Sequence, residues 1–211
     1  MIAERQELQV EDFFNIPLRI DETLSDEEKI EIIARHFNGI METLGLDLSD
    51  DSLKDTPNRV AKMYVKEIFS GLNPKNIPSI SLFENTYHYT EMLIEKDITL
   101  FSYCEHHFVP IIGKAHVAYI PAKKVIGLSK INRLVQYYSK RPQVQERLTI
   151  QIAEGLKEVL QTEDVAVKIE ASHLCVASRG IKDTQSSTTT TAFFGRFQQE
   201  KTRIEFLSSL R

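Results

Sequence analysis

Residues 165–175 alternate apolar and polar side chains with the two-residue period of a β-strand. One face carries Val165, Val167, Ile169 and Ala171, and the other carries Lys168, Glu170 and Ser172. Continuing the first face brings His173 and then Cys175 to the same side. The segment therefore predicts a strand that begins in the core and ends in two groups able to bind a metal or transfer protons.

A second informative stretch is Cys104-Glu105-His106-His107, which follows the apolar run Ile98-Thr99-Leu100-Phe101. Cys104 and His107 have the spacing with which a tight turn directs a thiolate and an imidazole at one metal ion. Cys175 is the only other cysteine of the chain, so a further thiolate ligand has to be this residue. A disulfide and a pair of ordinary buried thiols are the alternatives, and a reducing compartment disfavours the disulfide.

Three protein ligands on one Zn²⁺ leave a fourth position for water, which is typical of catalytic zinc. Bound zinc lowers the pKa of that water to about 7 and supplies a nucleophile at neutral pH. A structural site closed by His173 or His106 as a fourth ligand is the alternative. The same two histidines are candidates for proton transfer, and each is equally interpretable as a half-buried histidine with one backbone hydrogen bond. We interpret His36, His88 and His116, which lack such neighbours, as structural.

Composition narrows the classes of protein. A chain of 211 residues with 42% hydrophobic residues can bury a substantial core, and we expect one principal domain. The formal net charge of −4 and the pI near 5.9 argue against general binding to nucleic acid or to an anionic membrane. There is no apolar stretch of signal-peptide or bilayer-spanning length, so we expect a cytoplasmic protein.

The remaining pattern predicts a helical part followed by β-rich runs. A capping box at Ser25 opens an amphipathic helix that ends at Gly45, and Thr56-Pro57 opens a second one that runs to Gly71. Further helices are expected from Ser129 as the cap, from Pro142, and over 202–210. Strands are expected near 80–84, 91–102, 111–120 and 188–194. Residues 1–24 show no sustained period, and we interpret them as an arm that is partly disordered or docks on a neighbouring subunit.

Basic residues gather at two helix starts of this acidic chain, where they oppose the helix dipole. An anionic ligand explains them better than helix stability does, although a solvated charged face is the alternative for each one alone. No glycine-rich phosphate loop is present, so a phosphorylated ligand would be held by side chains and helix ends. The candidates are Arg59, Lys62, Lys130, Arg133 and Arg179.

Four segments together resemble the GTP cyclohydrolase I family, and the resemblance covers about residue 25 to the C-terminus. They are Cys104-Glu105-His106-His107-Phe108-Val109, Val125-Ile126-Gly127-Leu128-Ser129-Lys130-Ile131-Asn132-Arg133, Arg141-Pro142-Gln143-Val144-Gln145-Glu146-Arg147-Leu148-Thr149, and His173-Leu174-Cys175-Val176 with Arg179-Gly180. Their length and order make the match far more specific than a metal-binding motif alone.

The resemblance implies an α+β protein with a T-fold, in which helices cover one face of an antiparallel sheet and the sheets of several subunits form a barrel. A helical part over about 25–75 would precede a T-fold over about 78–211. Family members form homodecamers of two pentameric rings with active sites between subunits, and allosteric control is compatible with such an assembly. Residues 1–24 lie outside the resemblance.

The resemblance also implies a reaction and its residues. Zinc held by Cys104, His107 and Cys175 would activate water to attack C8 of GTP. Ring opening, release of formate, an Amadori rearrangement and reclosure would give 7,8-dihydroneopterin triphosphate, in the first step of tetrahydrofolate and pterin synthesis. The catalytic residues would be His106, His173 and Ser129. The substrate-binding residues would be Glu146 and Gln145 for guanine, and Arg59, Lys62, Lys130, Arg133 and Arg179 for the triphosphate.

Two alternatives belong to other functional classes. A reductase of the same fold family would act on a deazaguanine, with a cysteine as covalent nucleophile and a nicotinamide cofactor. A non-enzymatic purine-binding or scaffold protein would use zinc only for structure. The native metal is a further open choice, because Fe²⁺ also suits a site with two cysteines and one histidine.

Overall fold

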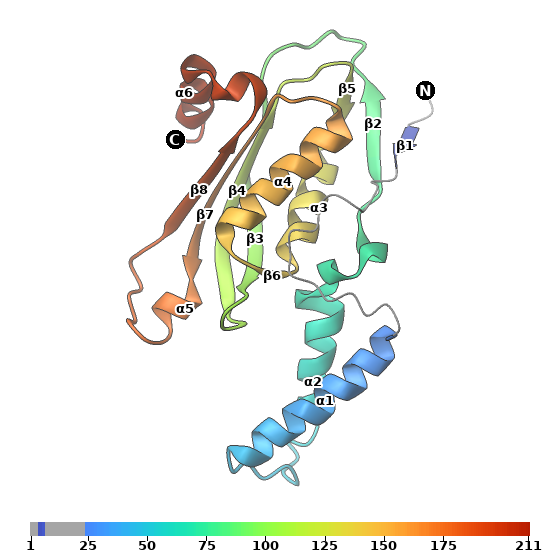
Figure 1. The fold of residues 1–211 in the computed structure, drawn as a ribbon, viewed down its shortest axis with the longest axis vertical. Coiled ribbons are helices and arrows are strands. Elements are labelled where there is room, and N and C mark those ends of the chain that lie inside the picture. The colour runs from blue at the N-terminus through green and yellow to red at the C-terminus, as the bar shows by residue number, and fades with distance from the viewer. Residues whose placement is uncertain (1–3, 7–23) are drawn as a thin grey trace.

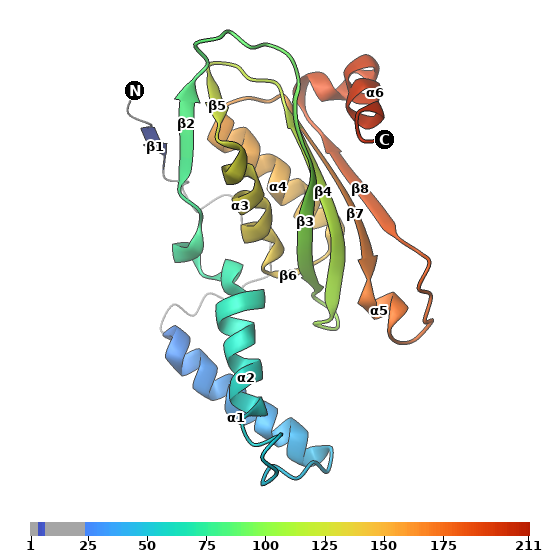
Figure 2. The same ribbon diagram turned by 180° about the vertical axis from the view of Figure 1, so that it is seen from behind.

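The computed structural model describes residues 4–6 and 24–211 of the chain. It is a mixed α+β structure in which helices cover one face of a curled five-stranded sheet (Figure 1). A helical N-terminal part projects beyond one end of that sheet, as the view from behind also shows (Figure 2). The predicted α+β class is confirmed. The barrel of subunits is a property of an assembly, and it stays a prediction.

The helical part begins with α1 (Asp26–Thr43), whose predicted capping box is present. The Ser25 hydroxyl accepts from the Glu28 backbone N–H at 3.2 Å, and the Glu28 carboxylate accepts from the Ser25 N–H at 2.7 Å. Next comes α2 (Thr56–Lys62), which continues as a π-helix over Met63–Ile68 and then as 3₁₀ turns over Ser70–Leu72 and Pro74–Asn76. Lys66 pairs with Glu27 at 2.9 Å and so ties the two helices together.

The five-stranded sheet has the order β6-β3-β4-β7-β8. Its strands are β3 (Leu93–Cys104), β4 (Pro110–Tyr119), β6 (Pro142–Gln143), β7 (Val165–His173) and β8 (Thr188–Phe193). All neighbours are antiparallel except β6, which runs parallel to β3 and places Gln143 opposite Cys104. Because Ile111 of β4 lies opposite His173, the β3–β4 turn and the end of β7 are neighbours in space.

A smaller sheet stands beside the main one and has the order β1-β2-β5. It consists of β1 (Glu4–Gln6), β2 (Ile80–Glu84) and β5 (Lys124–Ile126), all antiparallel. Residues 4–6 of the predicted N-terminal arm therefore pair with β2. The interpretation of residues 1–3 and 7–23 as part of an arm falls outside the described residues.

The main core lies between the sheet and two helices, α3 (Leu128–Ser139) and α4 (Gln145–Leu160). Leu134 of α3 and Leu148, Ile152 and Leu156 of α4 are buried in this core, whereas Val144, which precedes α4, is only half-buried. Burying one such side chain contributes about 1.5–3 kcal/mol. The opposite face of the sheet carries a second cluster, in which Phe197 of a 3₁₀ turn (Gly195–Gln198) packs on Phe206 of α6 (Glu200–Ser208).

One glycine joins the helical part to the sheet domain. The Gly71 N–H donates to the Lys140 carbonyl, and the buried Arg141 donates from Nε to the Gly71 carbonyl, both at 2.9 Å. A Cβ on Gly71 would lie 2.7 Å from the Lys140 carbonyl oxygen and closer still to that of Tyr137. Only glycine permits this approach of two backbone segments.

Three helix starts differ in the structure from those expected from the sequence. The cap of α3 is Gly127, so the expectation of Ser129 as cap is wrong. The fourth helix starts at Gln145 and not at Pro142, because Pro142 and Gln143 form β6 beside β3. Helix α6 begins at Glu200, two residues before the expected start. In the part of the chain that the structure describes, no helix has both the length and the apolarity needed to cross a bilayer.

His116 is a buried histidine of β4, in agreement with its structural interpretation. Its Nδ1 accepts from the Asp97 backbone N–H at 3.2 Å, at a register shift between β3 and β4. Burial lowers the pKa of His116 below the ordinary 6.5, while the Asp97 and Glu170 carboxylates oppose that shift and Lys168 and Lys114 reinforce it. Folding therefore favours the neutral form of this imidazole.

We expect the stability of the protein to fall as the pH drops below about 6.5, because the unfolded chain then binds a proton that folded His116 resists. Each unit by which folding lowers this pKa corresponds to about 1.4 kcal/mol of stability lost under acid conditions. The measurement is the thermal unfolding midpoint between pH 5 and 8, compared with that of His116→Gln. Equal pH dependence in both proteins would contradict the assignment.

Candidate metal centre and active site

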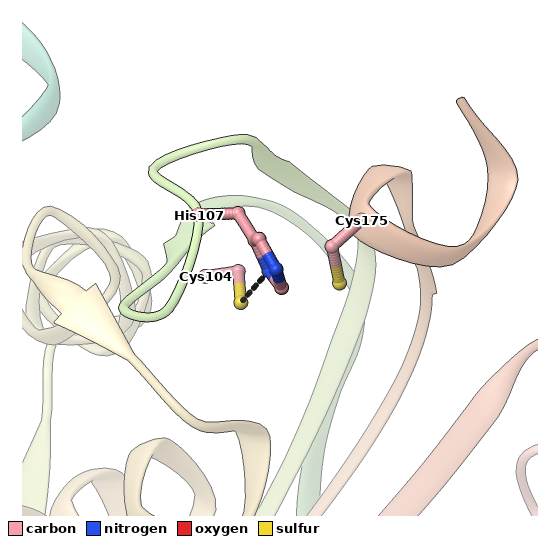
Figure 3. A group of neighbouring side chains, drawn as sticks. All are labelled: Cys104, His107 and Cys175. Atoms are coloured by element: carbon pink, nitrogen blue, oxygen red, sulfur yellow. Dashed lines mark hydrogen bonds between the residues drawn. The ribbon is translucent and has the colours of Figure 1, made fainter. Parts of the chain in front are cut away.

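Three side chains from two distant segments converge at one end of the sheet. They are Cys104 at the end of β3, His107 in the β3–β4 turn, and Cys175 of the short helix α5 (Leu174–Ala177). Their donor atoms all lie within 4.8 Å of one another, and Figure 3 shows the three side chains directed at a common space. The predicted donor set is therefore gathered in a single chain.

Backbone hydrogen bonds hold the β3–β4 turn, which carries the candidate metal ligands Cys104 and His107. The Cys104 N–H donates to the Val109 carbonyl at 2.9 Å, and the Phe108 N–H donates back to the Cys104 carbonyl at 2.8 Å. Phe108 has a φ of +52°, a conformation that costs a non-glycine residue energy. Its ring packs against Phe69 with centroids 5.0 Å apart, and this contact anchors the turn to the helical part.

Cys175 reaches the centre by a different route from the one that its sequence pattern predicts. Strand β7 ends at His173, so Cys175 does not continue the alternating face. The chain turns into α5 instead, and this turn brings the Cys175 thiol toward Cys104. Both cysteines are free thiols.

The donor set fits Zn²⁺, because two thiolates and one imidazole are a known catalytic combination. Burial, followed by the neighbouring Cys104 thiol, raises the pKa of the Cys175 thiol. A coordinated thiol loses its proton to the metal. Because three donors from two segments lie within 4.8 Å of one another, the arrangement favours metal ligation over the single covalent cysteine of a reductase.

The two candidate proton-transfer histidines have different surroundings. The His106 side chain is 64% exposed, and its Nδ1 lies 3.6 Å from the Cys104 sulfur. His173 is half-buried, and its Nε2 lies 2.8 Å from Oε1 of Gln145. Burial lowers the pKa of His173, and the Glu146 carboxylate partly opposes that shift. His173 therefore has a fixed position, and His106 faces solvent.

The two predicted guanine contacts also differ. Glu146 lies exposed in the first turn of α4. Gln145 is 1% exposed, and its amide is engaged with β7, β8 and His173. Glu146 is thus free to receive a ligand in this chain, and the geometry of Gln145 supports a different role.

Only one of the five predicted phosphate-binding residues reaches the metal centre. Arg179 Nη1 lies 3.0 Å from His107 Nε2. Arg59 is exposed on α2 and donates to the Ser52 carbonyl at 2.9 Å, and Lys62 is exposed at the end of the same helix.

Ser129, Lys130 and Arg133 begin α3 beside β5, whereas the end of α3 leads into β6 next to Cys104 (Figure 1). A helix of 12 residues spans about 18 Å, so Ser129 and Lys130 are separated from the metal centre of their own chain by about a helix length.

Glu105 and Arg147 form a site contact that the sequence pattern did not single out. The Arg147 guanidinium pairs with the Glu105 carboxylate inside the metal-binding turn, and Arg147 Nε donates to Oε1 of buried Gln143 at 3.1 Å. The Glu105 N–H also donates to the Gln143 carbonyl at 3.0 Å. A charged residue between two candidate ligands was the available signal, but its partner, 42 positions away, was not visible in the sequence.

Replacing Arg147 by methionine is expected to weaken Zn²⁺ binding by about 10–100-fold, because the turn that carries Cys104 and His107 loses its lateral support. Competition with a chromophoric chelator measures the affinity. Arg196→Met is the matched control, since Arg196 pairs with Asp164 away from the centre. Equal affinity in the two variants would contradict the supporting role.

Comparison with known proteins agrees with this geometry. Residues 33–211 match the model of the family described as GTP cyclohydrolase I. The chain is 61% identical to GTP cyclohydrolase 1 of Flavobacterium johnsoniae, over 92% of this chain and 88% of that protein. It is 57% identical to the enzymes of the same name from Aeromonas salmonicida (89% and 87% covered) and Salmonella arizonae (92% and 89% covered).

The solved structure of an archaeosine synthase, QueF-Like in the apo form, is 18% identical, with 48% of this chain and 90% of that chain covered. Its TM-score of 0.40 is too low to decide fold or activity.

The fold and the site together define an α+β protein with a Cys-His-Cys centre at the end of a sheet. Given the family match and the identities of 57–61%, the chain belongs to the GTP cyclohydrolase I family and is an enzyme, a hydrolase.

Proposed function

We propose that this protein converts GTP and water into 7,8-dihydroneopterin triphosphate and formate, the first step of tetrahydrofolate and pterin synthesis. The observation that carries the proposal is the convergence of Cys104, His107 and Cys175 within 4.8 Å, close to the start of the helix that bears Glu146. Membership of the family supports the choice of GTP.

In this proposal Cys104, His107 and Cys175 hold one Zn²⁺ per chain. When bound, the ion lowers the pKa of a coordinated water toward 7 and so supplies the nucleophile for C8 of guanine. Addition of water and cleavage of the C8–N9 bond open the imidazole ring, and a second hydrolysis releases C8 as formate. Rearrangement of the ribose and ring closure with loss of water complete a balance of one net water consumed.

The residues of the chain bind the base and move protons. The Glu146 carboxylate accepts from guanine N1–H and from the exocyclic amine, a pair of donors that adenine lacks. His106 and His173 transfer protons to and from the reacting purine, because a histidine is suited to exchange protons near neutral pH. Arg179, on the same side as His107, binds the triphosphate.

The remaining predicted residues support an active site shared between subunits. Ser129 and Lys130 lie about a helix length from the metal centre of their own chain, Arg133 lies one turn further along α3, and Arg59 and Lys62 lie on the projecting helical part. A neighbouring copy would bring them to the substrate, with Ser129 near the ribose and the four cations at the triphosphate. A shared site requires an oligomer, and the family resemblance makes a homodecamer of two pentamers the assembly that we propose.

Incubation with GTP tests the proposal directly. Formate is measured enzymatically, and the pterin is measured by fluorescence after oxidation. Equal amounts of the two products are expected from GTP and none from ATP. Absence of both products from protein that contains about one zinc per chain would overturn the proposed function.

A further inference from the structure

Gln145 is the most completely engaged polar side chain next to the candidate active site. It is 1% exposed, and its Oε1 lies 2.8 Å from Nε2 of His173. We infer that Gln145 is a positioning residue that holds neutral His173 in its Nε2–H tautomer, so that Nδ1 is the atom with which His173 accepts a proton. The inference rests on the proposed function in that His173 acts on the purine.

The direction of the Gln145 amide follows from its partners. Its Nε2 lies 3.2 Å from the Ile169 carbonyl oxygen and 3.0 Å from that of Thr188. A carbonyl oxygen only accepts hydrogen bonds, so the NH₂ group has to face these two strands. Turning the amide over would place its oxygen against both carbonyls and leave buried acceptors without donors.

Two threonine hydroxyls fix the same direction independently. Thr149 donates to the Gln145 backbone carbonyl at 2.8 Å, so its only hydroxyl proton is used. The contact of 2.6 Å between the hydroxyls of Thr149 and Thr190 therefore has Thr190 as donor. Thr190 Oγ1 then accepts from Gln145 Nε2 at 3.1 Å. The Gln145 amide offers two protons to three acceptors, which are the Ile169 and Thr188 carbonyls and Thr190 Oγ1, and all three lie on the side where the NH₂ group must be.

The consequence for His173 is a single neutral tautomer. With the amide NH₂ committed to β7 and β8, the Gln145 Oε1 that faces the imidazole can only accept. Nε2 must carry the proton, and Nδ1 keeps the lone pair. A base of defined tautomer needs no rearrangement before it accepts a proton. Because the Gln145 amide is fully used in hydrogen bonds within the protein, we assign the recognition of guanine to Glu146.

Nuclear magnetic resonance of the imidazole nitrogens tests the tautomer without using activity. Zinc-loaded protein with ¹⁵N-labelled histidine is recorded by magic-angle spinning at pH 8, and His173 is assigned by the signal lost in His173→Asn. A protonated Nε2 and an unprotonated Nδ1 are expected. The opposite tautomer, or an imidazolium at pH 8, would overturn the inference.

Two variants separate positioning from packing. Gln145→Leu removes the acceptor from His173, and the control Thr162→Val removes a part-buried polar side chain at the other end of the sheet, where Thr162 donates to the Ile120 carbonyl at 3.4 Å. Gln145→Leu is expected to populate both His173 tautomers and to lower kcat for GTP by about 100-fold, the lower range of acid–base catalysis. KM should stay within about twofold, and Thr162→Val should show neither effect.

The outcomes distinguish this inference from its alternatives. A raised KM with unchanged kcat in Gln145→Leu would make Gln145 a guanine contact and overturn the inference. Thr190→Val removes one acceptor of the Gln145 amide and is expected to lower kcat by a smaller factor than Gln145→Leu does. This variant replaces Gln145→Leu as the test if the Gln145→Leu protein does not fold. If the wild-type protein releases no formate from GTP, the proposed function fails, while the spectrum of His173 still decides the tautomer.

Discussion

Replacing Cys175 by serine is expected to abolish both zinc binding and formation of the pterin product. A hydroxyl does not replace a thiolate as a zinc ligand, because it keeps its proton at neutral pH. Two remaining donors, Cys104 and His107, are too few for a stable site. We expect less than a tenth of a zinc per chain and turnover lowered by at least about 10⁴-fold.

Metal analysis of protein purified without chelator, together with the formate assay, measures both effects. Val176→Ser is the matched control, since it changes a neighbouring exposed residue of the same short helix. Cys175→Ser protein that retained a full complement of zinc would show that Cys175 is not a ligand. It would also reopen the alternative of a structural site closed by His173 or His106.

Replacing Glu146 by alanine is expected to remove the selectivity for guanine. Truncating one partner of a charged hydrogen-bonded pair costs about 2–5 kcal/mol, which corresponds to a loss of about 30- to 5,000-fold in kcat/KM for GTP. Zinc content should not change, because Glu146 is not one of the gathered donors.

Competition between GTP and ATP for the variant, measured by calorimetry or inhibition, reports the selectivity. Glu154→Ala on the same helix is the control, since Glu154 pairs with Lys157 away from the metal centre. A Glu146→Ala protein that still preferred GTP over ATP as strongly as the wild type would refute the assignment of the guanine anchor.

Local patterns predicted much of the fold because they depend on neighbours in the chain. The capping box at Ser25 and the alternation over Val165–His173 are local in this sense, and the structure contains both. The start of α4 was misplaced because Pro142 and Gln143 pair with β3, an interaction that no local signal contains. The π-helix after α2 and the strand β5 likewise depend on packing and pairing with distant residues.

The candidate site, like the fold, was predictable from the sequence only in part. Donor spacing in the turn indicated Cys104 and His107, and the scarcity of cysteine pointed to Cys175. The Glu105–Arg147 pair was not predictable, because ion-pair partners are chosen by folding and not by spacing. For Gln145, the family resemblance implied a contact with guanine, and the direction of its hydrogen bonds now supports a role in positioning His173.

By itself, the sequence determined which chemical groups this enzyme has: two thiols, the histidines beside them, and the Glu146 carboxylate. The tertiary structure alone decided how they meet. Strand β7 stops at His173 and the chain turns into α5, so Cys175 reaches Cys104 across the sheet end, away from the face predicted by alternation. The physical reason is that side-chain identity fixes which bonds are available, whereas strand register and burial fix which atoms lie within reach.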